Sequence, residues 1–568
     1  MTSPRPPRTL GRAETFKRDW LDGFAGAYGR TVRKVPGAYG VLARHAPERG
    51  RVAVVIGGGC GHYPAFAGLV GRGLATGAVV GDVFTSPSAE QVYRTAREAD
   101  GGAGVLFSYG NYQGDVLHFG LAARRLAAEG IDSRTVLVTD DVASGPADAP
   151  QRRRGVAGDF MVFKVAGAAA ERGDDLDAVA ALAGRANDAT RTFGVAFDGC
   201  TLPGASEPLF TVDETTMELG LGIHGEPGVR TVPRLDAVGV ADALVDGLLP
   251  ELPSQGDGRL AVLLNGLGNT KYEDMFVLYK RVHERLAGHG LNPLHTEVGE
   301  FVTSLDMAGV SLTVLALDDE LAPLYAAPCD TPAYRSGGAT LATVAPVSTV
   351  DDALDRPEGP GTAGVVDRLL TAGLARIEAN EHELGRLDAV AADGDHGLGM
   401  TRGMRAAVTA ARAAEAAGAG VSGALLTAGT AFADAAGGAS GALYGVLLAE
   451  TGAGLDGDIT AAAVADAVDR AAAAFVELGG AKPGDKTMLD AIEPFRLALR
   501  EHAGSGVVRA WREAAAQAVR AAADTAELAP TKGRAARLAQ RSKGYADPGA
   551  TSFALLVSAI GDEWERTN

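Results

Sequence analysis

Residues 387–397 read LDAVAADGDHG, a stretch in which Asp388, Asp393 and Asp395 place three carboxylates within eight residues. One helix could not turn all three side chains to the same side, because their spacings do not match the helical period of about 3.6 residues. A tight turn after a helix could, since the glycines of this stretch free the backbone. Clustered carboxylates repel one another and favour a hard cation such as Mg²⁺, which leaves positions open for phosphate oxygens. The alternative is an acidic, solvated turn.

The sequence around this stretch changes character after residue 364, where alanine and leucine recur at helical spacing. The segments that fit helices are residues 365–380, 401–417, 423–435, 459–478, 489–501, 507–525 and 551–563. No segment there reads convincingly as a strand. We therefore predict an all-α bundle over residues 365–568.

Three glycine-rich loops separate these helical segments: residues 436–441 (AGGASG), 479–490 (GGAKPGDKTMLD) and 544–551 (GYADPGAT). The first could hold phosphate with backbone N–H groups at a helix N-terminus, with Ser440 as cap or ligand. The second offers cations, a capping Thr487 and an apolar side chain for a base. Each loop alone could be ordinary turn or helix-packing chemistry. Together with the aspartates they predict a nucleotide–metal site, and the absence of any Gly-Lys pair excludes a P-loop.

The first 340 residues have a different pattern, in which short apolar runs alternate with helical segments. Strands are predicted at residues 51–56, 78–81, 104–109, 135–138, 260–264 and 310–317, and helices at 88–99, 116–128, 155–172 and 175–192. This favours a mixed α/β fold in two lobes. A proline-containing stretch without periodicity follows. The predicted organisation is an α/β domain over residues 1–341, a linker over 342–364 and an all-α domain over 365–568.

Three ionisable residues of the α/β half are candidate ligand-binding groups. His62 ends a glycine-rich run that follows a predicted strand, a place where open α/β sheets bind ligands. His224 lies among glycines in GLGIHGEPG (220–228), so its imidazole would be reachable, although a structural histidine is the alternative. Asp115 alone would most often be a helix N-cap. The lone GxGxxG match in 220–225 follows no apolar strand and is discounted as a dinucleotide signal.

Composition limits the partners. With 53 basic and 71 acidic residues the net charge is −18, which argues against nucleic-acid and anionic-membrane binding. Three distant cysteines, Cys60, Cys200 and Cys329, indicate neither a disulfide framework nor a zinc site and fit a reducing cytoplasm. The first twelve residues lack the apolar core of a secretory signal. The sequence contains no run of about 18 apolar residues, so we predict no membrane span.

The order of short motifs along nearly the whole chain resembles the ATP-dependent dihydroxyacetone kinases in their two-domain, single-chain form. Besides the aspartate stretch and the three loops, the motifs are GGGCGH (57–62), FTSPS (84–88), NYQGD (111–115), GVAG (155–158), GIHGEPG (222–228), NGLG (265–268) and TSLDMAG (303–309). The resemblance implies an α/β half that binds the ketose and an all-α helical barrel that binds Mg-ATP. It also implies a homodimer.

The resemblance also implies roles for individual residues. His224 would bond covalently to the substrate carbonyl carbon, Asp115 would be the base for the hydroxyl, and His62 would hydrogen-bond the substrate beside Gly58 and Gly59. Asp388, Asp393 and Asp395 would hold two Mg²⁺ ions on the phosphates. The expected nucleotide contacts are Gly438, Ser440, Gly441, Thr487, Met488, Arg534, Asp547 and Pro548.

Several residues depart from the family pattern. Cys60, Tyr63 and Phe66 stand where the family usually has Ser, Glu and His, and Ala392 stands where it usually has Gly. The string after Arg534 also differs. The resemblance implies dihydroxyacetone as the substrate, and the departures at Tyr63 and Phe66 favour a tetrulose such as erythrulose as the alternative. A ketose-binding sensor without transfer activity is the alternative from another class, and the aspartate cluster argues against it.

Overall fold

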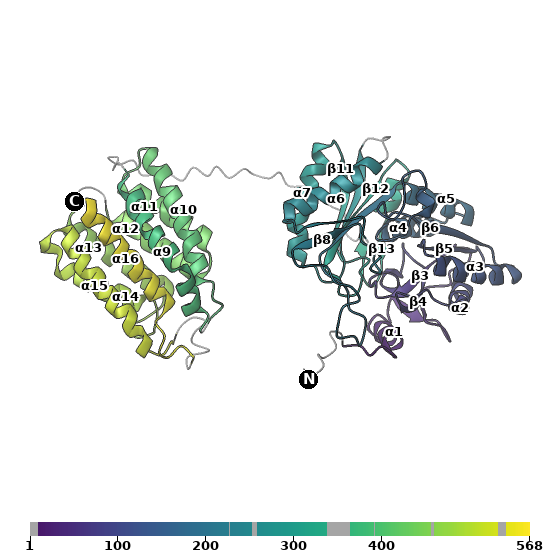
Figure 1. The fold of residues 1–568 in the computed structure, drawn as a ribbon, viewed down its shortest axis with the longest axis horizontal. Helices are drawn as coiled ribbons and strands as arrows, with labels where there is room; N and C mark the ends of the chain where they lie inside the picture. Colours follow the sequence, from purple (N-terminus) through teal and green to yellow (C-terminus); the bar gives the residue numbers. More distant parts are fainter. Residues whose placement is uncertain are drawn as a thin grey trace. The chain divides into compact units, whose positions relative to one another are not determined.

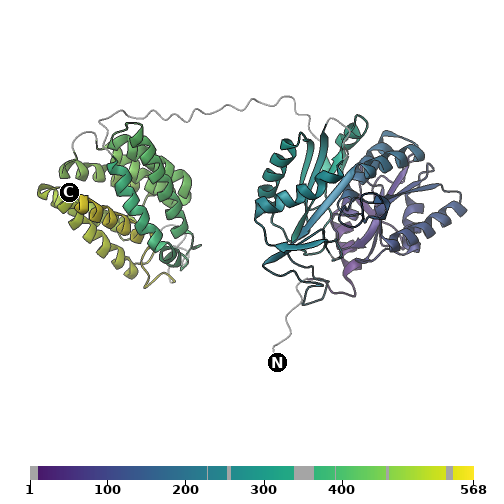
Figure 2. The same ribbon diagram turned by 45° about the horizontal axis from the view of Figure 1, so that its top comes forward.

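The computed structural model describes residues 10–226, 228–252, 258–337, 364–390, 392–455, 459–531 and 541–567. The chain divides into two compact units, Met1–Ala345 and Pro346–Asn568, and Figures 1 and 2 show the elements of each. The predicted linker, apart from Gly364, lies outside the described residues. Within the described residues no helix combines the length and the apolar character needed to cross a bilayer.

The first unit contains two six-stranded sheets, so the two-lobed α/β prediction is confirmed. The first sheet has the order β1-β2-β4-β3-β5-β6, with β3 to β6 parallel to one another and β2 antiparallel to β4. Its strands are β1 (Val32–Lys34), β2 (Gly40–Ala43), β3 (Ala53–Cys60), β4 (Gly77–Val83), β5 (Val105–Gly110) and β6 (Ser133–Val138). The helices along this part are α1 (Phe16–Ala27), α2 (Ala89–Ala99), α3 (Gln113–Ala128), α4 (Gly158–Arg172) and α5 (Leu176–Asp188).

The second sheet has the order β11-β10-β12-β7-β8-β9, in which only β10 and β11 pair in parallel. Its strands are β7 (Thr190–Ala196), β8 (Thr216–Leu219), β9 (Arg230–Pro233), β10 (Arg259–Gly266), β11 (Asn292–Gly299) and β12 (Gly309–Ala316). The accompanying elements are α6 (Ala237–Leu248), α7 (Tyr272–Gly288), α8 (Leu321–Ala326) and the hairpin of β13 (Cys329–Asp330) and β14 (Arg335–Ser336).

Helix α4 contacts strands of both sheets, among them β3, β5, β7 and β12. Almost every side chain from Phe160 to Ala170 is buried, which follows from its nearly continuous apolar sequence. The N-terminus of this buried helix is one wall of the cavity described below. A helix fixed from two sides is a rigid support for residues at its first turn.

The second unit is a closed ring of eight helices within the described residues, which confirms the all-α prediction. Each helix packs on the next, and α16 packs back on α9. The helices are α9 (Val365–Asp388), α10 (His396–Ala416), α11 (Val421–Ala436), α12 (Gly438–Ala453), α13 (Ala461–Gly479), α14 (Leu489–Glu501), α15 (Val507–Asp524) and α16 (Pro548–Thr567). Short 3-10 turns occur at Ala67–Leu69, Pro150–Arg152, Leu249–Glu251, Ala503–Ser505 and Thr525–Glu527.

Two details of the sequence interpretation were wrong. The helix predicted over residues 175–192 ends at Asp188, and the β-branched residues from Thr190 begin β7 instead. The glycines after residue 56 continue strand β3 rather than forming a loop. A Cβ on Gly57 would lie 2.7 Å from the carbonyl oxygen of Val79, so the strand depends on glycine to pair with β4.

Candidate active site

A cavity of about 260 Å³ in the first unit is formed by the ends of β3 and β5, the first turns of α3 and α4, and the loop after β8. It is lined by Gly57, Gly58, Gly59, His62, Phe66, Phe84, Ser86, Gly110, Tyr112, Asp115, Gly155, Asp159, Ile223, His224 and Val302. The structure thus brings together all five residues of this half that the sequence singled out. These five residues, Gly58, Gly59, His62, Asp115 and His224, come from three separate segments of the chain.

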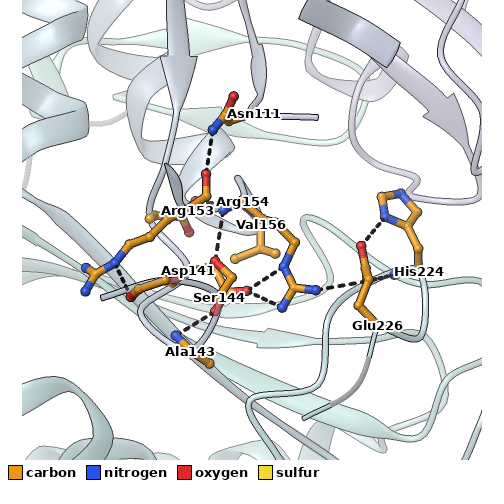
Figure 3. Close-up of polar contacts among 11 residues, drawn as sticks. Asn111, Asp141, Ala143, Ser144, Arg153, Arg154, Val156, His224 and Glu226 are labelled. Carbon is orange, nitrogen blue, oxygen red and sulfur yellow. Dashed lines mark hydrogen bonds and ion pairs between the residues drawn. The ribbon is translucent and has the colours of Figure 1, made fainter. Parts of the chain in front are cut away.

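His224 is held from one side by a chain of charged groups (Figure 3). Its Nδ1 lies 3.1 Å from Glu226 Oε1, and its backbone N–H donates to Glu226 Oε2 at 3.0 Å. Arg154 Nη1 lies 3.6 Å from Glu226 Oε2, and Arg154 Nη2 donates to Asp141 Oδ2 at 2.9 Å. Burial alone would raise the pKa of Glu226, but His224 and Arg154 lower it to about 2. Glu226 is therefore an anion, and it accepts a hydrogen bond from the Nδ1–H of His224.

His62 faces His224 from the other side. Its Nδ1 lies 2.7 Å from the carbonyl oxygen of Thr303, which can only accept, so this nitrogen carries a proton. Its Nε2 lies 3.0 Å from His224 Nε2. Burial, followed by the charge of His224, lowers the pKa of His62 to about 3, so its ring stays neutral near pH 7. The two imidazoles meet through their Nε2 atoms at the cavity wall.

Asp115 is a residue of the first turn of α3, whose N-cap is Tyr112, so the N-cap role considered for Asp115 is wrong. Its side chain is buried, and its Oδ1 has no hydrogen-bond partner among the described residues. Burial raises the pKa of Asp115 to about 6, although the Ser86 hydroxyl and His224 act in the opposite direction. A carboxyl group with this pKa can act as a base near neutral pH.

Of the three residues that depart from the family pattern here, Cys60, Tyr63 and Phe66, only Phe66 lines the cavity. Phe66 lines it and packs within 2.4 Å of a Cβ that would be built on Gly58. Tyr63 turns away and packs edge-on against Trp20. Burial raises the pKa of the Cys60 thiol to about 12, and this side chain does not line the cavity.

Sequence reasoning missed three residues of this site: Tyr112 and Asp159, which line the cavity, and Glu226, which contacts His224. Glu226 lies within the GIHGEPG string, two residues after His224, and could have been found from that position. Tyr112 is likewise part of a quoted motif. Asp159 follows the GVAG string but carries no motif of its own, and only its burial beside the cavity marks it.

In the second unit, the oxygen ligand atoms of Asp388, Asp393 and Asp395 all lie within 4.8 Å of one another. The turn that was predicted to bring them together lies between α9, which ends at Asp388, and α10, which begins at His396. Asp388 Oδ2 accepts the backbone N–H of Gly394 at 2.9 Å, and Gly394 has a φ of 81°. Three clustered carboxylates, two of them exposed, fit the oxygen preference of Mg²⁺.

The first glycine loop joins this cluster through a side-chain network. Ser440 Oγ lies 3.3 Å from Nδ1 of His396, which directly follows Asp395, and His396 Nε2 lies 2.9 Å from Ser552 Oγ. Gly438 begins α12 with a φ of 60°, and a Cβ there would meet nothing within 4 Å. Gly441 packs closely on the Ala433 carbonyl. This open helix N-terminus is suited to an anion.

The other two loops pack on each other beside the same network. Asp547 Oδ1 accepts the backbone N–H of Ala550 at 2.7 Å, and Pro548 is the first residue of α16, as in a capped helix N-terminus. Burial raises the pKa of Asp547 to about 7. Met488 is buried in the helical core and contacts Gly549. The backbone N–H of Thr487 donates to Asp490 Oδ2. Arg534 lies outside the described residues.

Comparisons with known proteins agree with this arrangement. Residues 22–333 match the Dak1 domain and residues 390–562 the DAK2 domain. The L-erythrulose 1-kinase of Mycolicibacterium smegmatis is 50% identical over 570 residues, covering 98% of this chain and 99% of the relative. A D-erythrulose kinase of the same organism is 51% identical over 566 residues, covering 96% and 97%.

Among solved structures, the dihydroxyacetone kinase of C. freundii in complex with AMP-PNP and Mg²⁺ matches with a TM-score of 0.60 and 28% identity, over 98% of this chain and 99% of that one. The match therefore includes both units of the chain. The chain belongs to the single-chain dihydroxyacetone kinase family, the ketose kinases that combine a Dak1 and a DAK2 domain.

Proposed function

We propose that this kinase transfers the γ-phosphoryl group of Mg-ATP to a hydroxyl of a tetrulose, with erythrulose as the substrate. The sequence interpretation put dihydroxyacetone first and erythrulose second. Two relatives of 50% and 51% identity over almost the whole chain are erythrulose kinases, whereas the dihydroxyacetone kinase structure is 28% identical. The observation that carries the reaction is the meeting of His62, His224 and Asp115 in one cavity.

His224 is the group proposed to hold the ketose. Glu226 fixes its Nδ1–H, which leaves the Nε2 lone pair for the electrophilic carbon of a ketone. The neutral His62 lies beside it, and its unprotonated Nε2, 3.0 Å from that of His224, can accept a hydrogen bond from a substrate hydroxyl. As the nitrogen–carbon bond forms, the carbonyl π electrons move to oxygen, which takes a proton from solvent, and the anionic Glu226 balances the positive charge left on the His224 ring. A polyol lacks such a carbon, so the bond would exclude glycerol.

Asp115 is proposed to accept the proton of the substrate hydroxyl as its oxygen attacks the γ-phosphorus and the bond to the ADP oxygen breaks. Mg²⁺ held by Asp388, Asp393 and Asp395 would neutralise charge on the phosphate oxygens. Gly58 and Gly59 would let the substrate approach the backbone of β3. The proposed nucleotide contacts remain Gly438, Ser440, Gly441, Thr487, Met488, Arg534, Asp547 and Pro548.

The proposal extends to organisation and location. Ketose binding is assigned to residues 1–341 and nucleotide binding to residues 365–568, supported by two compact units with separate cores. A homodimer is expected from the family resemblance. The three cysteines are free and buried, which suits a reducing cytoplasm.

The test is an ADP-release assay with D-erythrulose, L-erythrulose, dihydroxyacetone, glyceraldehyde and glycerol. We expect the highest kcat/KM with one erythrulose enantiomer, a lower value with dihydroxyacetone and no turnover of glycerol. A higher kcat/KM with dihydroxyacetone than with either erythrulose enantiomer would identify the triose as the preferred substrate. No ADP with any compound would favour the sensor alternative.

A further inference from the structure

Asp159 is a buried acid in the ketose cavity for which the proposed reaction has no use. It lies in the first turn of α4, its side chain is 3% exposed, and it lines the cavity. Its Oδ1 has no hydrogen-bond partner among the described residues. A buried polar atom without a partner costs about 1–3 kcal/mol, so such an atom beside a cavity indicates a partner supplied by a ligand.

Asp159 is not needed to cap α4, because Asp140 accepts the backbone N–H groups there. The backbone N–H groups of Val156 and Gly158 donate to the two carboxylate oxygens of Asp140, at 2.8 and 2.7 Å. A Cβ on Gly158 would lie 2.4 Å from Asp140, so the two groups are packed as closely as glycine allows. Asp140 therefore satisfies the helix N-terminus, and Asp159 is left facing the cavity.

The surroundings also decide which form of Asp159 meets a ligand. Burial, and then the nearby carboxyl groups of Asp140 and Asp115, raise the pKa of Asp159 well above its usual range. The neutral acid offers one O–H donor and an acceptor oxygen. This pairing suits a hydroxyl group, which also donates and accepts, and it does not suit a phosphate or a metal ion.

Counting polar groups distinguishes the two candidate ketoses. Three residues that line this cavity carry a buried oxygen with no hydrogen-bond partner in the described part of the chain: Tyr112 Oη, Asp115 Oδ1 and Asp159 Oδ1. Dihydroxyacetone has two hydroxyl groups and a tetrulose has three. The carbonyl oxygen and the two terminal hydroxyl groups are common to both ketoses, so the tetrulose differs by offering one further hydroxyl to these oxygens.

We propose that Asp159 is a specificity residue that hydrogen-bonds a hydroxyl of the four-carbon chain and so favours tetruloses over trioses. The proposal rests on the proposed ketose kinase function and adds the residue that selects among ketoses. It also assigns the third hydroxyl to the first turn of α4, a helix that is fixed from two sides.

The test compares Asp159→Leu, which removes both hydrogen-bonding atoms at similar size, with Asp159→Asn, which keeps a donor and an acceptor. We expect the ratio of kcat/KM for erythrulose to that for dihydroxyacetone to fall about tenfold or more in the Leu variant, and to stay within about threefold of the wild-type ratio in the Asn variant. Met161→Leu, on α4 but not on the cavity, is the matched control and should leave the ratio unchanged.

If the Leu variant folds poorly, a second measurement on other variants tests the same proposal. Intact-protein mass spectrometry of the Asn and Met161 variants with mixed ketoses should show the wild-type proportion of tetrulose adduct, and Asp159→Val, a smaller apolar substitution, should show less of it. Equal losses for both ketoses in the Leu variant would overturn the specificity role. Wild-type enzyme that uses dihydroxyacetone better than erythrulose would instead contradict the proposed substrate, and it would overturn the specificity proposal with it.

Discussion

At the scale of single residues, the cavity of the first unit depends on neighbours that fix which atoms carry protons. His62 is neutral because it is buried, and the carbonyl of Thr303 determines which of its nitrogens carries hydrogen. Glu226 remains an anion through His224 and Arg154. Asp115, which lines the cavity, has a pKa that burial raises to about 6. Two carboxyl groups in one site thus differ by several pKa units and can take different roles.

The covalent role of His224 gives the first prediction. His224→Ala should abolish the mass increase of one ketose on the protein and lower kcat/KM by about 100-fold or more, because the nucleophile is gone. Intact-protein mass spectrometry after incubation with erythrulose measures the adduct. His283→Ala, an exposed histidine on α7, is the control and should keep it. An adduct that persists in the His224 variant would refute the covalent role.

The pKa of Asp115 gives the second prediction. A base must be ionised, and this pKa is raised to about 6, so activity should be present above pH 6 and lost as the pH falls through that value. Below it, kcat/KM should drop about tenfold per pH unit. Asp115→Asn should lower kcat by about 10²- to 10⁴-fold and remove this limb of the profile. A wild-type profile that is flat between pH 5 and 7 would exclude Asp115 as the base.

At the scale of elements, both sites lie where helices and strands end. The aspartate cluster could be predicted because its spacing excludes one helix and its glycines favour a turn, and both are visible in the sequence. The continuation of β3 through its glycines could not be predicted from the sequence, because it depends on the close approach of β4 and Phe66. Asp159 was missed for the same reason, since its burial and its lack of a partner arise only when α4 packs between the sheets.

The turn between α9 and α10 gives the third prediction. Asp393→Asn should weaken Mg²⁺-dependent ATP binding by more than about 100-fold, because even the loss of a group that supports a metal ligand costs about 10- to 100-fold. Ketose adduct formation should be unchanged. The control is Asp562→Asn, which changes an exposed acid near the C-terminal end of α16 and should leave ATP binding unchanged. Calorimetric titration of ATP with and without Mg²⁺ measures the effect, and equal affinities of variant and wild type would contradict the metal role.

At the scale of the whole molecule, each unit has an interior of its own. The buried apolar clusters of the first unit contain only residues between Leu21 and Cys329, and the cluster of the helical unit contains only residues between Val366 and Val557. No cluster among the described residues draws from both units. Domains with separate cores generally fold alone. The two units are therefore expected to fold as independent domains.

Separate cores give the last prediction, which concerns the two halves produced as independent proteins. Residues 1–341 should form the ketose adduct without nucleotide, because His62, His224 and Asp115 all belong to that half. Residues 365–568 should bind Mg-ATP without ketose. ADP release with erythrulose should require both, since donor and acceptor are bound by different polypeptides. The rate should rise with the concentration of either half, whereas the intact chain benefits from the effective concentration of about millimolar that a linker provides.

The matched control for this experiment is a mixture in which the first half carries His224→Ala, and it should release little ADP although Mg-ATP binding is intact. Mass spectrometry, calorimetry and the ADP assay thus report on the two sites and on their cooperation separately. If the first half formed no adduct alone although the intact chain does, ketose binding would depend on the helical unit. The assignment of each ligand to one half of the chain would then be wrong, even with the kinase activity itself established.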